Sequence, residues 1–378
     1  MMSNSLDDFS DESDLNNGDG KITYARFNQD STCLAIGRDG GFGIYNCNPF
    51  SWACERNLAG RTEDGIHIIE MMYRSNIIAI VGEAASDAPN IFSDNNEGMP
   101  WQDNVLVIWD DKKGSVVAQL VFSGPIRNVR LLRKIIVVAL DEEVYVYKLE
   151  NVELLDTIDT YNNPQGLCAV SSNGNLSIVV YPALENGVVG VKIYQSNPMT
   201  DAIKRIESFG IKAHRSRISN ISLCSNGMLL TTVSYSGAFL RLWNVFTGQR
   251  LQEFKLRIGR ANVTFCQLSH DTKYMHVVDS KNNLSIFKIK LKAAYDNPKV
   301  TCMTDVRLFT GYVIKKCIQS TKLMMDAQRE FAKYRTDSPI IASTFLPNTN
   351  NILIVLEDRS VLRLRVSGKL KLLATHSL

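Results

Sequence analysis

The cationic residues best placed to hold an acidic partner are gathered in one short segment of this sequence. The segment LQEFKLRIGRANV, residues 251–263, places Lys255 and Arg257 on either side of Leu256, with Arg260 close behind. Local clustering of this kind can attract an anion even though the formal net charge of the chain is only +3. That net charge is too small to indicate nucleic-acid binding. The segment therefore directs attention to a local acidic ligand, and we expect no nucleic-acid partner.

Residues with the spacing of catalytic or metal sites are missing from the sequence. There is no H-E-x-x-H, no P-loop, no G-x-S-x-G and no G-x-G-x-x-G opening a helix. The paired carboxylates of VIWDD (107–111) and LDEEV (140–144) are interpreted as turns between strands. We therefore expect a binding module that is not an enzyme and uses no cofactor or metal. The five histidines of the sequence are His67, His214, His270, His276 and His376, and none of them falls in a metal-ligand spacing.

Composition places the chain in a reducing compartment. Apolar residues make up 45% of the sequence, which is enough for a folded core, and charged residues make up 21%. The eight cysteines form no C-x-x-C pair and are expected to be buried free thiols. Residues 1–20 are acidic and nearly free of large apolar side chains, so we expect a disordered tail without the features of a signal peptide. No run reaches the ~20 apolar residues of a membrane span, so we expect a cytoplasmic protein whose membrane contact is peripheral.

One pattern recurs along the chain: a short strand of alternating apolar residues that follows a polar turn. Alternation with a period of two marks a half-buried strand, and the spacing of about 40–60 residues is typical of propeller blades. Seven such strands predict an all-β fold, a seven-bladed WD40-type β-propeller over residues 21–367, with a long amphipathic loop in blade six (290–338) and a C-terminal tail (368–378). The seven strands are FGIYN (42–46), VLVIWD (105–110), VYVYKL (144–149), VGVKIY (189–194), FLRLWN (239–244), LSIFKI (284–289) and VLRLRV (361–366).

Several segments together resemble the PROPPIN family, the phosphoinositide-binding propellers that include the WIPI and autophagy-related protein 18 groups. The resemblance spans roughly residues 22–366. It implies recruitment to membranes that carry phosphatidylinositol 3-phosphate or 3,5-bisphosphate during autophagy, through two basic pockets beside a Phe/Leu-Arg-Arg-Gly motif. The segments that carry it are ITYARFNQDSTCLAIGRDGGFGIYNCNPF (22–50), EMMYRSNIIAIVG (70–82), NVLVIWDDKKGSVVAQLVFSGPIRNVRL (104–131), YNNPQGLCAVS (161–171) and AHRSRISNISLCSNGMLLTTVSYSGAFLRLWNVFTGQRLQEF (213–254).

The resemblance implies a first phosphoinositide pocket in TTVSYSGAFLR, residues 231–241. Arg forks grip phosphate bidentately, and hydroxyls donate further hydrogen bonds. By position, Thr232 and Ser234 supply hydroxyls, Gly237 a close backbone approach, Arg241 the guanidinium and His214 the family histidine. Two alternatives stay open: His214 as the cap of a blade turn, and Arg241 as an ordinary strand residue with a solvated tip.

The arginine motif and the second pocket are both degenerate. Aligned without gaps, the motif falls on Phe254, Lys255, Leu256 and Arg257, so one arginine becomes a lysine and the other a leucine that can donate nothing. A frame shifted by two residues would instead read LRIG (256–259). In the second pocket, VDSKNNLSIF (278–287) has Asn283 and Ser285 in place of the family threonine and histidine, and Asp279 adds an anion. We expect one damaged pocket and one that is nearly lost.

The long insertion predicts a membrane-facing element. In YVIKKCIQSTKLMMDAQREFAKYR (312–335), apolar residues recur at helical spacing among lysines and arginines, as in a basic amphipathic helix that lies in a headgroup interface. A helix packed against the side of the propeller is the alternative. The residues expected to insert into the membrane are Leu323, Met324, Phe331 and Tyr334.

The resemblance also implies partners. RFNQD (26–30) matches the family's first-blade turn, where Asn28 and Asp30 would help to dock an autophagy-related protein 2-type lipid-transfer protein, and an Asx turn is the alternative role for either residue. The expected function is that of a peripheral adaptor on preautophagosomal, endosomal or vacuolar membranes that binds phosphatidylinositol 3-phosphate weakly. The competing hypothesis is a propeller scaffold that has lost lipid binding and acts through protein contacts alone.

Overall fold

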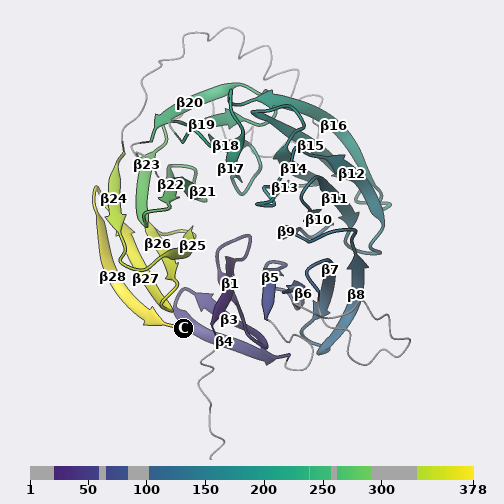
Figure 1. Ribbon diagram of the computed structural model, residues 1–378, viewed down its shortest axis with the longest axis horizontal. Helices are drawn as coiled ribbons and strands as arrows, with labels where there is room; N and C mark the ends of the chain where they lie inside the picture. The colour runs from purple at the N-terminus through teal and green to yellow at the C-terminus, as the bar shows by residue number, and fades with distance from the viewer. Residues whose placement is uncertain (1–20, 59–64, 84–101, 238, 257–261, 291–329) are drawn as a thin grey trace, which may run out of the picture.

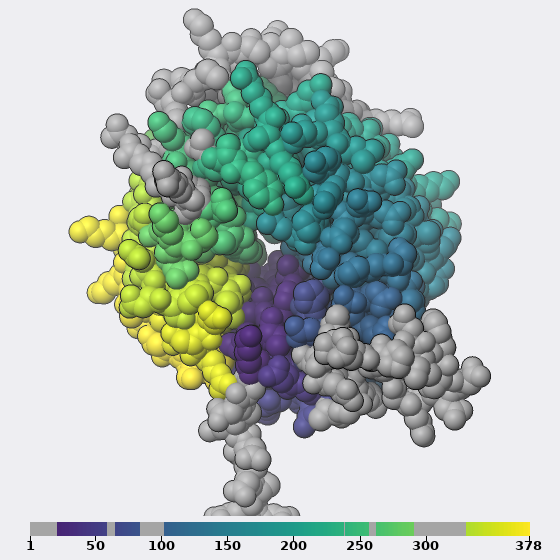
Figure 2. Space-filling view, viewed as in Figure 1, coloured from purple at the N-terminus to yellow at the C-terminus, as the bar shows by residue number. Residues whose placement is uncertain are grey.

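Seven four-stranded antiparallel sheets are arranged as blades around a central axis in the computed structural model (Figure 1). The structure describes residues 21–58, 65–83, 102–237, 239–256, 262–290 and 330–378. Each sheet is built from four consecutive strands, and the strand order within each blade follows the chain without crossover. The space-filling view leaves a narrow opening at the centre of the ring (Figure 2). The predicted seven-bladed propeller is confirmed.

The first four blades contain β1 to β16, with blade one being β1–β4, blade two β5–β8, blade three β9–β12 and blade four β13–β16. Their bounds are β1 Ile22–Phe27, β2 Cys33–Arg38, β3 Gly41–Cys47, β4 Phe50–Asn57, β5 Ile66–Met71, β6 Ile77–Gly82, β7 Val105–Asp110, β8 Ser115–Val121, β9 Asn128–Leu131, β10 Ile135–Ala139, β11 Glu143–Lys148, β12 Leu154–Asp159, β13 Ala169–Asn173, β14 Leu176–Pro182, β15 Val188–Ser196 and β16 Ile203–Lys212.

The last three blades contain β17 to β28, with blade five being β17–β20, blade six β21–β24 and blade seven β25–β28. Their bounds are β17 Ile218–Leu223, β18 Leu229–Ser234, β19 Phe239–Asn244, β20 Arg250–Lys255, β21 Val263–Leu268, β22 Tyr274–Asp279, β23 Asn283–Lys288, β24 Ala332–Arg335, β25 Ile340–Phe345, β26 Asn351–Leu356, β27 Ser360–Val366 and β28 Leu370–Ser377.

The seven strands predicted from alternation are the third strands of the seven blades. They are β3, β7, β11, β15, β19, β23 and β27. The second strands lie deeper: every residue of β14, for example, is buried, because neighbouring blades cover both of its faces. The outer strands are largely exposed, as β4 and β28 show. Burial of these sheet faces between blades makes a ring of apolar clusters rather than one central core.

The ring closes by side-chain packing between blades one and seven, since neither sheet borrows a strand from the other. Leu34 and Ile36 of β2 share a buried cluster with Leu353 and Val355 of β26. A hydrogen bond of 2.6 Å joins Ser31 Oγ to Thr344 Oγ1, and His270 Nε2 reaches Ser31 Oγ at 3.1 Å. Closure therefore depends on apolar burial and a few buried hydroxyl contacts.

Two boundaries expected from the sequence are wrong. Residues 370–377 form the outer strand β28, which pairs with β27, rather than a tail. Residues 332–335, assigned to the end of a helix in the insertion, form β24 and pair with β23. Both segments are largely exposed and carry few buried apolar residues, so their pattern did not stand out. The expected acidic tail (1–20) and most of the insertion lie outside the described residues.

Candidate anion-binding site

Thr232 joins three elements of blade five through its hydroxyl. The side chain is fully buried in β18. Trp243 Nε1 of β19 donates to Thr232 Oγ1 at 2.9 Å, and His214 Nε2, from the β16–β17 connection, lies 3.0 Å from the same oxygen. A hydroxyl surrounded in this way holds the blade together and is not exposed to a ligand. The expectation that Thr232 binds phosphate is therefore not supported by its geometry.

Arg241 is held by blade-five groups through most of its donors. Its Nε donates to Glu253 Oε2 of β20 at 2.7 Å, and Nη1 donates to the Ala213 carbonyl at 2.6 Å. Arg250 Nη1 also donates to Glu253 Oε2, at 3.1 Å. The Glu253 carboxylate therefore neutralises much of the positive charge of Arg241 that would attract a phosphate. Arg241 therefore resembles an ordinary strand residue more than a guanidinium that is free to bind a phosphate with two hydrogen bonds.

His214 is neutral in this network. Arg241 Nη1 lies 3.5 Å from His214 Nδ1, and since a guanidinium can only donate, Nδ1 is the acceptor and Nε2 carries the proton given to Thr232. Burial, together with the charge of Arg241, lowers the pKa of His214 to about 4. His214 is thus a neutral imidazole whose two ring nitrogens both have hydrogen-bond partners. It caps the start of blade five, which agrees with the alternative role left open for this residue.

Replacing Thr232 with valine is expected to destabilise the protein without touching the proposed ligand surface. The variant leaves Trp243 Nε1 and His214 Nε2 without their shared partner, and an unsatisfied buried donor costs about 1–3 kcal/mol. Urea unfolding followed by tryptophan fluorescence measures this loss. Thr232→Ser, which keeps the hydroxyl, should lose much less; equal losses in the two variants would contradict the assigned role.

The turn between β18 and β19 contains two of the predicted residues, Ser234 and Gly237, and both are buried beside the exposed Ser236. Ser234 Oγ and Ser236 Oγ are 2.8 Å apart, and Gly237 donates its N–H to the Ser234 carbonyl at 2.8 Å. Gly237 has φ +62°, a conformation that favours glycine. This turn can offer hydroxyls and backbone groups, so Ser234 and Gly237 stay predicted ligand contacts.

The residues of the degenerate arginine motif are alternately buried and exposed at the end of β20. Phe254 is fully buried and packs its ring 5.6 Å from that of Phe287, while Leu256 is 6% exposed in the same cluster between blades five and six. Lys255, between them, is exposed and makes no ion pair with a described residue. Leucine in the second arginine position therefore packs as a core residue. Arg257 and the rest of the LRIG frame lie outside the described residues.

A cleft between blades five and six coincides with the expected second pocket. We call it the five–six cleft; its lining residues are Lys255, Leu256, Val277, Asp279, Asn283, Ser285, Phe287 and Glu330. Asp279 is buried, and its carboxylate accepts hydrogen bonds from the backbone of Lys281 and Asn283 and from the Asn283 amide. The Asp279 carboxylate, which was expected to repel phosphate, therefore accepts hydrogen bonds mainly from residues of its own turn.

Two of the residues expected to enter a membrane belong to the propeller. Phe331 and Tyr334 are half-buried against the cluster between blades six and seven, and the Phe331 ring lies 5.7 Å from that of Tyr274. This packing against the blades does not favour their insertion into a bilayer, which stays a prediction. Leu323 and Met324 lie outside the described residues.

Asn28 is a structural turn residue. Its Oδ1 accepts from the backbone N–H groups of Thr32 and Cys33, and its Nδ2 donates to Thr32 Oγ1 and to the Tyr73 carbonyl. The amide has no capacity left for a partner, which agrees with the Asx-turn alternative. Asp30 is half-exposed and, among the residues that the structure describes, accepts hydrogen bonds from Thr32 alone, so it stays a candidate for docking.

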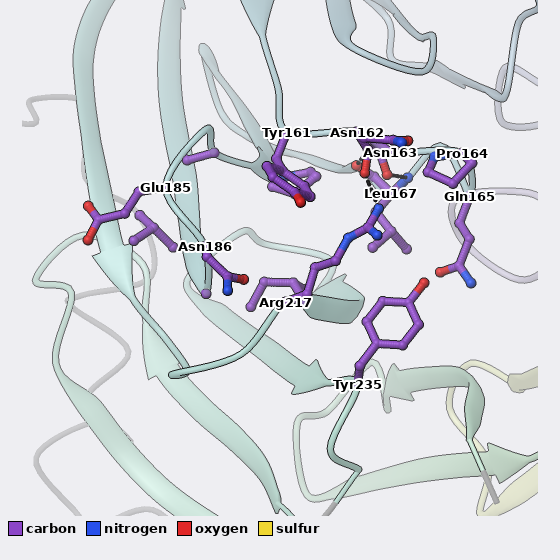
Figure 3. Close-up of a pocket in the computed structure, with 15 residues that line it drawn as sticks. Tyr161, Asn162, Asn163, Pro164, Gln165, Leu167, Glu185, Asn186, Arg217 and Tyr235 are labelled. Atoms are coloured by element: carbon purple, nitrogen blue, oxygen red, sulfur yellow. Dashed lines mark hydrogen bonds between the residues drawn. The ribbon is translucent and has the colours of Figure 1, made fainter.

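One feature was missed in the sequence: a hollow lined by an arginine between two tyrosines (Figure 3). The Arg217 guanidinium lies 5.0 Å from the Tyr161 ring centroid and 5.6 Å from that of Tyr235, and it donates to the Asn162 carbonyl. Tyr161 and Tyr235 are 45% and 42% exposed. Arg217 and Tyr235 flank the β17–β18 hairpin of blade five, whereas Tyr161 lies between blades three and four, so no local pattern could have found all three together.

Within the described ranges, no group of histidine, cysteine and acidic residues could hold a metal ion. The same part of the chain contains no helix that is long and apolar enough to cross a membrane.

Comparisons with known sequences agree on one family. The family model described as PROPPIN matches residues 22–339. SVP1-like protein 2 of Pichia angusta is 31% identical over 293 residues, covering 77% of this chain and 75% of that protein. Autophagy-related protein 18 of Komagataella pastoris is 28% identical over 315 residues, and the match covers 74% of this chain but 54% of the relative. The chain thus spans about half the length of that relative.

Solved structures show the same fold. Kluyveromyces lactis Hsv2 superposes with a TM-score of 0.71 at 19% identity, covering 95% of this chain and 99% of that one. A complex of KlAtg21 with the coiled coil of AgAtg16 gives a TM-score of 0.67 at 20% identity, with 94% and 99% covered. At these identities the likeness concerns architecture alone.

Proposed function

This chain belongs to the PROPPIN family, and from that membership we propose that it is a non-enzymatic peripheral membrane adaptor in autophagosome formation. It binds phosphatidylinositol 3-phosphate, with the 3,5-bisphosphate as a second ligand, and it binds them weakly. The observation that carries the proposal is Lys255, an exposed cation at a cleft that also presents Asn283 and Ser285. A phosphate needs such a cation together with hydrogen-bond donors.

Weak binding follows from the groups that are already engaged. Arg241 is paired with Glu253, Thr232 is buried beneath Trp243, and Leu256 lies in the apolar cluster between the blades. Two tethered sites on one membrane gain avidity, and weakening either one can reduce apparent binding by orders of magnitude. The chain would then depend on partners for part of its recruitment.

Removal of the Lys255 charge tests this proposal. Purified protein is expected to pellet with phosphatidylcholine liposomes that contain phosphatidylinositol 3-phosphate, and Lys255→Ala should reduce the pelleted fraction several-fold. Lys288→Ala removes an exposed charge at the far end of β23 and serves as the control. If the pelleted fraction is the same with and without phosphatidylinositol 3-phosphate, or is unchanged in Lys255→Ala, the hypothesis that lipid binding has been lost is favoured.

The proposed partners follow the family. An autophagy-related protein 2-type lipid-transfer protein is proposed to dock at the blade-one turn through Asp30, and Leu323 and Met324 are proposed to contact the bilayer. The adaptor would act on preautophagosomal, endosomal or vacuolar membranes. A related propeller has been solved with the coiled coil of AgAtg16, so a helical partner is a further possibility for this fold.

A function through protein contacts alone is the second candidate, and the Arg217 hollow is the observation that favours it. Tyrosine and arginine dominate the energetics of protein interfaces, particularly where aromatic rings order the arginine. Arg217→Ala combined with Tyr235→Ala is expected to leave liposome pelleting unchanged but to weaken capture of a purified coiled-coil partner. If the double variant captures that partner as well as the wild type, the hollow is not its docking site.

A further inference from the structure

We propose that a hollow at blades three and four binds a basic segment of a partner protein, in which lysine or arginine side chains lie beside an apolar one. The hollow has a volume of about 650 Å³, and ligand sites in proteins measure roughly 300–1,000 Å³. We call it the acidic hollow, because its lining includes four carboxylates together with a threonine and a leucine. These residues are Asp141, Glu142, Glu143, Asp159, Thr160 and Leu184.

The acidic hollow lies apart from the surfaces proposed for lipid and for the lipid-transfer protein. Its residues come from the β10–β11 turn, the end of β12 and the β14–β15 turn, which share one face of the ring. In the antiparallel blades, the β1–β2 turn that carries Asp30 lies at the other end of the strands. Blade six lies across the ring from blade three (Figure 1). A partner in the acidic hollow can therefore bind while the other surfaces stay free.

Most of the negative charge in the acidic hollow has no cation beside it. Arg127 donates to both carboxylate oxygens of Asp141, at 3.0 Å each, and so neutralises one of the four acids. Glu142 and Asp159 are exposed and form no ion pair with any residue in the described ranges. The hollow is thus strongly acidic in a chain whose formal net charge is +3. Such a local field attracts a partner of opposite charge.

Two of the acids oppose each other across neighbouring strands. Glu143 of β11 is directly opposite Asp159 of β12, and like charges in directly opposed positions destabilise a sheet. The hydroxyl of Tyr145 donates to Glu143 Oε2 at 2.7 Å, but a neutral donor leaves the repulsion in place. A bound ammonium or guanidinium group would remove it. The strand register therefore indicates a cationic ligand.

Thr160, which follows Asp159, gives the acidic hollow an unmet acceptor. The side chain is only 4% exposed, and its Oγ1 has no hydrogen-bond partner in the part of the chain that the structure describes. Buried hydroxyls without a partner are rare because they are destabilising. Lysine and arginine side chains carry several N–H donors and no acceptor. A cation from a partner can thus donate to Thr160 as well as to the carboxylates.

The lining favours a peptide segment over a metal ion. A metal ion needs oxygens that converge on it at about 2–2.6 Å, and no group of acidic residues in the described ranges is placed in this way. Leu184 also lines the hollow and is 62% exposed. It can pack against an apolar side chain of a partner. A segment that carries lysine or arginine beside such a side chain matches both the charge and the leucine.

Fluorescence anisotropy of a labelled peptide of alternating arginine and leucine residues, added to the full chain at physiological ionic strength, tests the inference. Glu142→Gln with Asp159→Asn should weaken peptide binding about fivefold to tenfold, because two exposed ion pairs are lost. Glu150→Gln with Glu153→Gln is the matched control. It removes the same charge from the exposed β11–β12 turn, at the other end of blade three, and should leave peptide binding nearly unchanged.

Thr160→Val separates a ligand role from a structural one. Valine keeps the shape of threonine and removes a hydroxyl that has no partner within the described ranges. The variant should therefore unfold at the same urea concentration as the wild type or at a higher one, while it binds the peptide several-fold more weakly. A variant that is less stable than the wild type, or that binds the peptide equally well, would contradict the assignment of Thr160 to the site.

Three results would overturn the proposal. A wild type that does not bind the peptide has no such site, and equal weakening by the two pairs of acid substitutions would mean that the attraction is non-specific. If spermine binds as tightly as the peptide, the hollow takes small amines and the assignment to a protein segment is wrong. Liposome pelleting by the Glu142→Gln and Asp159→Asn variant is expected to match the wild type, so these results are independent of the proposed lipid function.

Discussion

Replacing Leu256 with arginine is expected to strengthen binding to liposomes with phosphatidylinositol 3-phosphate by roughly one to two orders of magnitude. Leu256 lines the five–six cleft, so an arginine there can extend its guanidinium outward while its stem stays in the apolar cluster. A hydrogen bond to a charged group contributes about 1.5–3 kcal/mol, and each 1.4 kcal/mol is a tenfold change in affinity. Liposome co-sedimentation over a range of lipid concentrations measures the gain.

Two further variants at this position separate charge, geometry and packing. Leu256→Met conserves volume and adds no charge, so its lipid binding should match that of the wild type. Leu256→Lys adds a point charge without a fork and should recover only part of the gain. Because Leu256 is 6% exposed, the charged variants are also expected to be less stable. A folded Leu256→Arg protein whose binding is no tighter would show that the cleft does not hold the lipid phosphate.

Acidification is expected to destabilise the propeller strongly between pH 6.5 and pH 5. Burial lowers the pKa of His276 to about 3 and, together with Arg241, that of His214 to about 4; burial also lowers the pKa of His270. The unfolded chain binds protons below about pH 6.5, and the folded chain does not, so stability is complete above that pH and is lost as the pH falls. With 1.36 kcal/mol per pKa unit, His276 and His214 each account for about 2 kcal/mol by pH 5.

His276→Gln isolates one of these contributions. The imidazole is fully buried between Phe265 and Phe345, and its Nε2 lies 2.8 Å from Ser343 Oγ, a contact that a glutamine amide can replace. Urea unfolding of the variant and the wild type at several pH values should show a pH slope that is smaller by about one proton in the variant. The window lies above the ordinary carboxyl range, so acidic groups contribute little to it. Identical slopes would mean that His276 is not held neutral.

The repeating architecture was predictable from local pattern because the third strand of each blade carries a short alternating apolar stretch that follows a turn. Strands such as Val105–Asp110 and Phe239–Asn244 were found in this way. The outer strands were less visible. Ala332–Arg335 is only one short stretch beside a long insertion, and its charged residues favoured an amphipathic helix, whereas pairing with β23 makes it a strand. Tertiary pairing overrode a local helical preference there.

Candidate site residues divided in the same way. That Lys255 is a cation beside a leucine could be read directly from the sequence, and so could the loss of an arginine at Leu256. Whether a polar side chain is free to meet a ligand could not, because that depends on its neighbours across strands and blades. Thr232 and Arg241 have the chemistry of ligands, yet Trp243, His214 and Glu253 already engage them.

By itself, then, the amino-acid sequence determined the seven-bladed propeller, the family resemblance and the rewritten arginine motif. Each of these is encoded in residue type and short-range spacing. Only the tertiary structure decided that Asn28 holds a turn, that Phe331 and Tyr334 pack against the blades, and that Glu143 stands opposite Asp159. The physical reason is that the availability of a side chain is a property of its surroundings, and in a propeller those surroundings come from strands that are far apart along the chain.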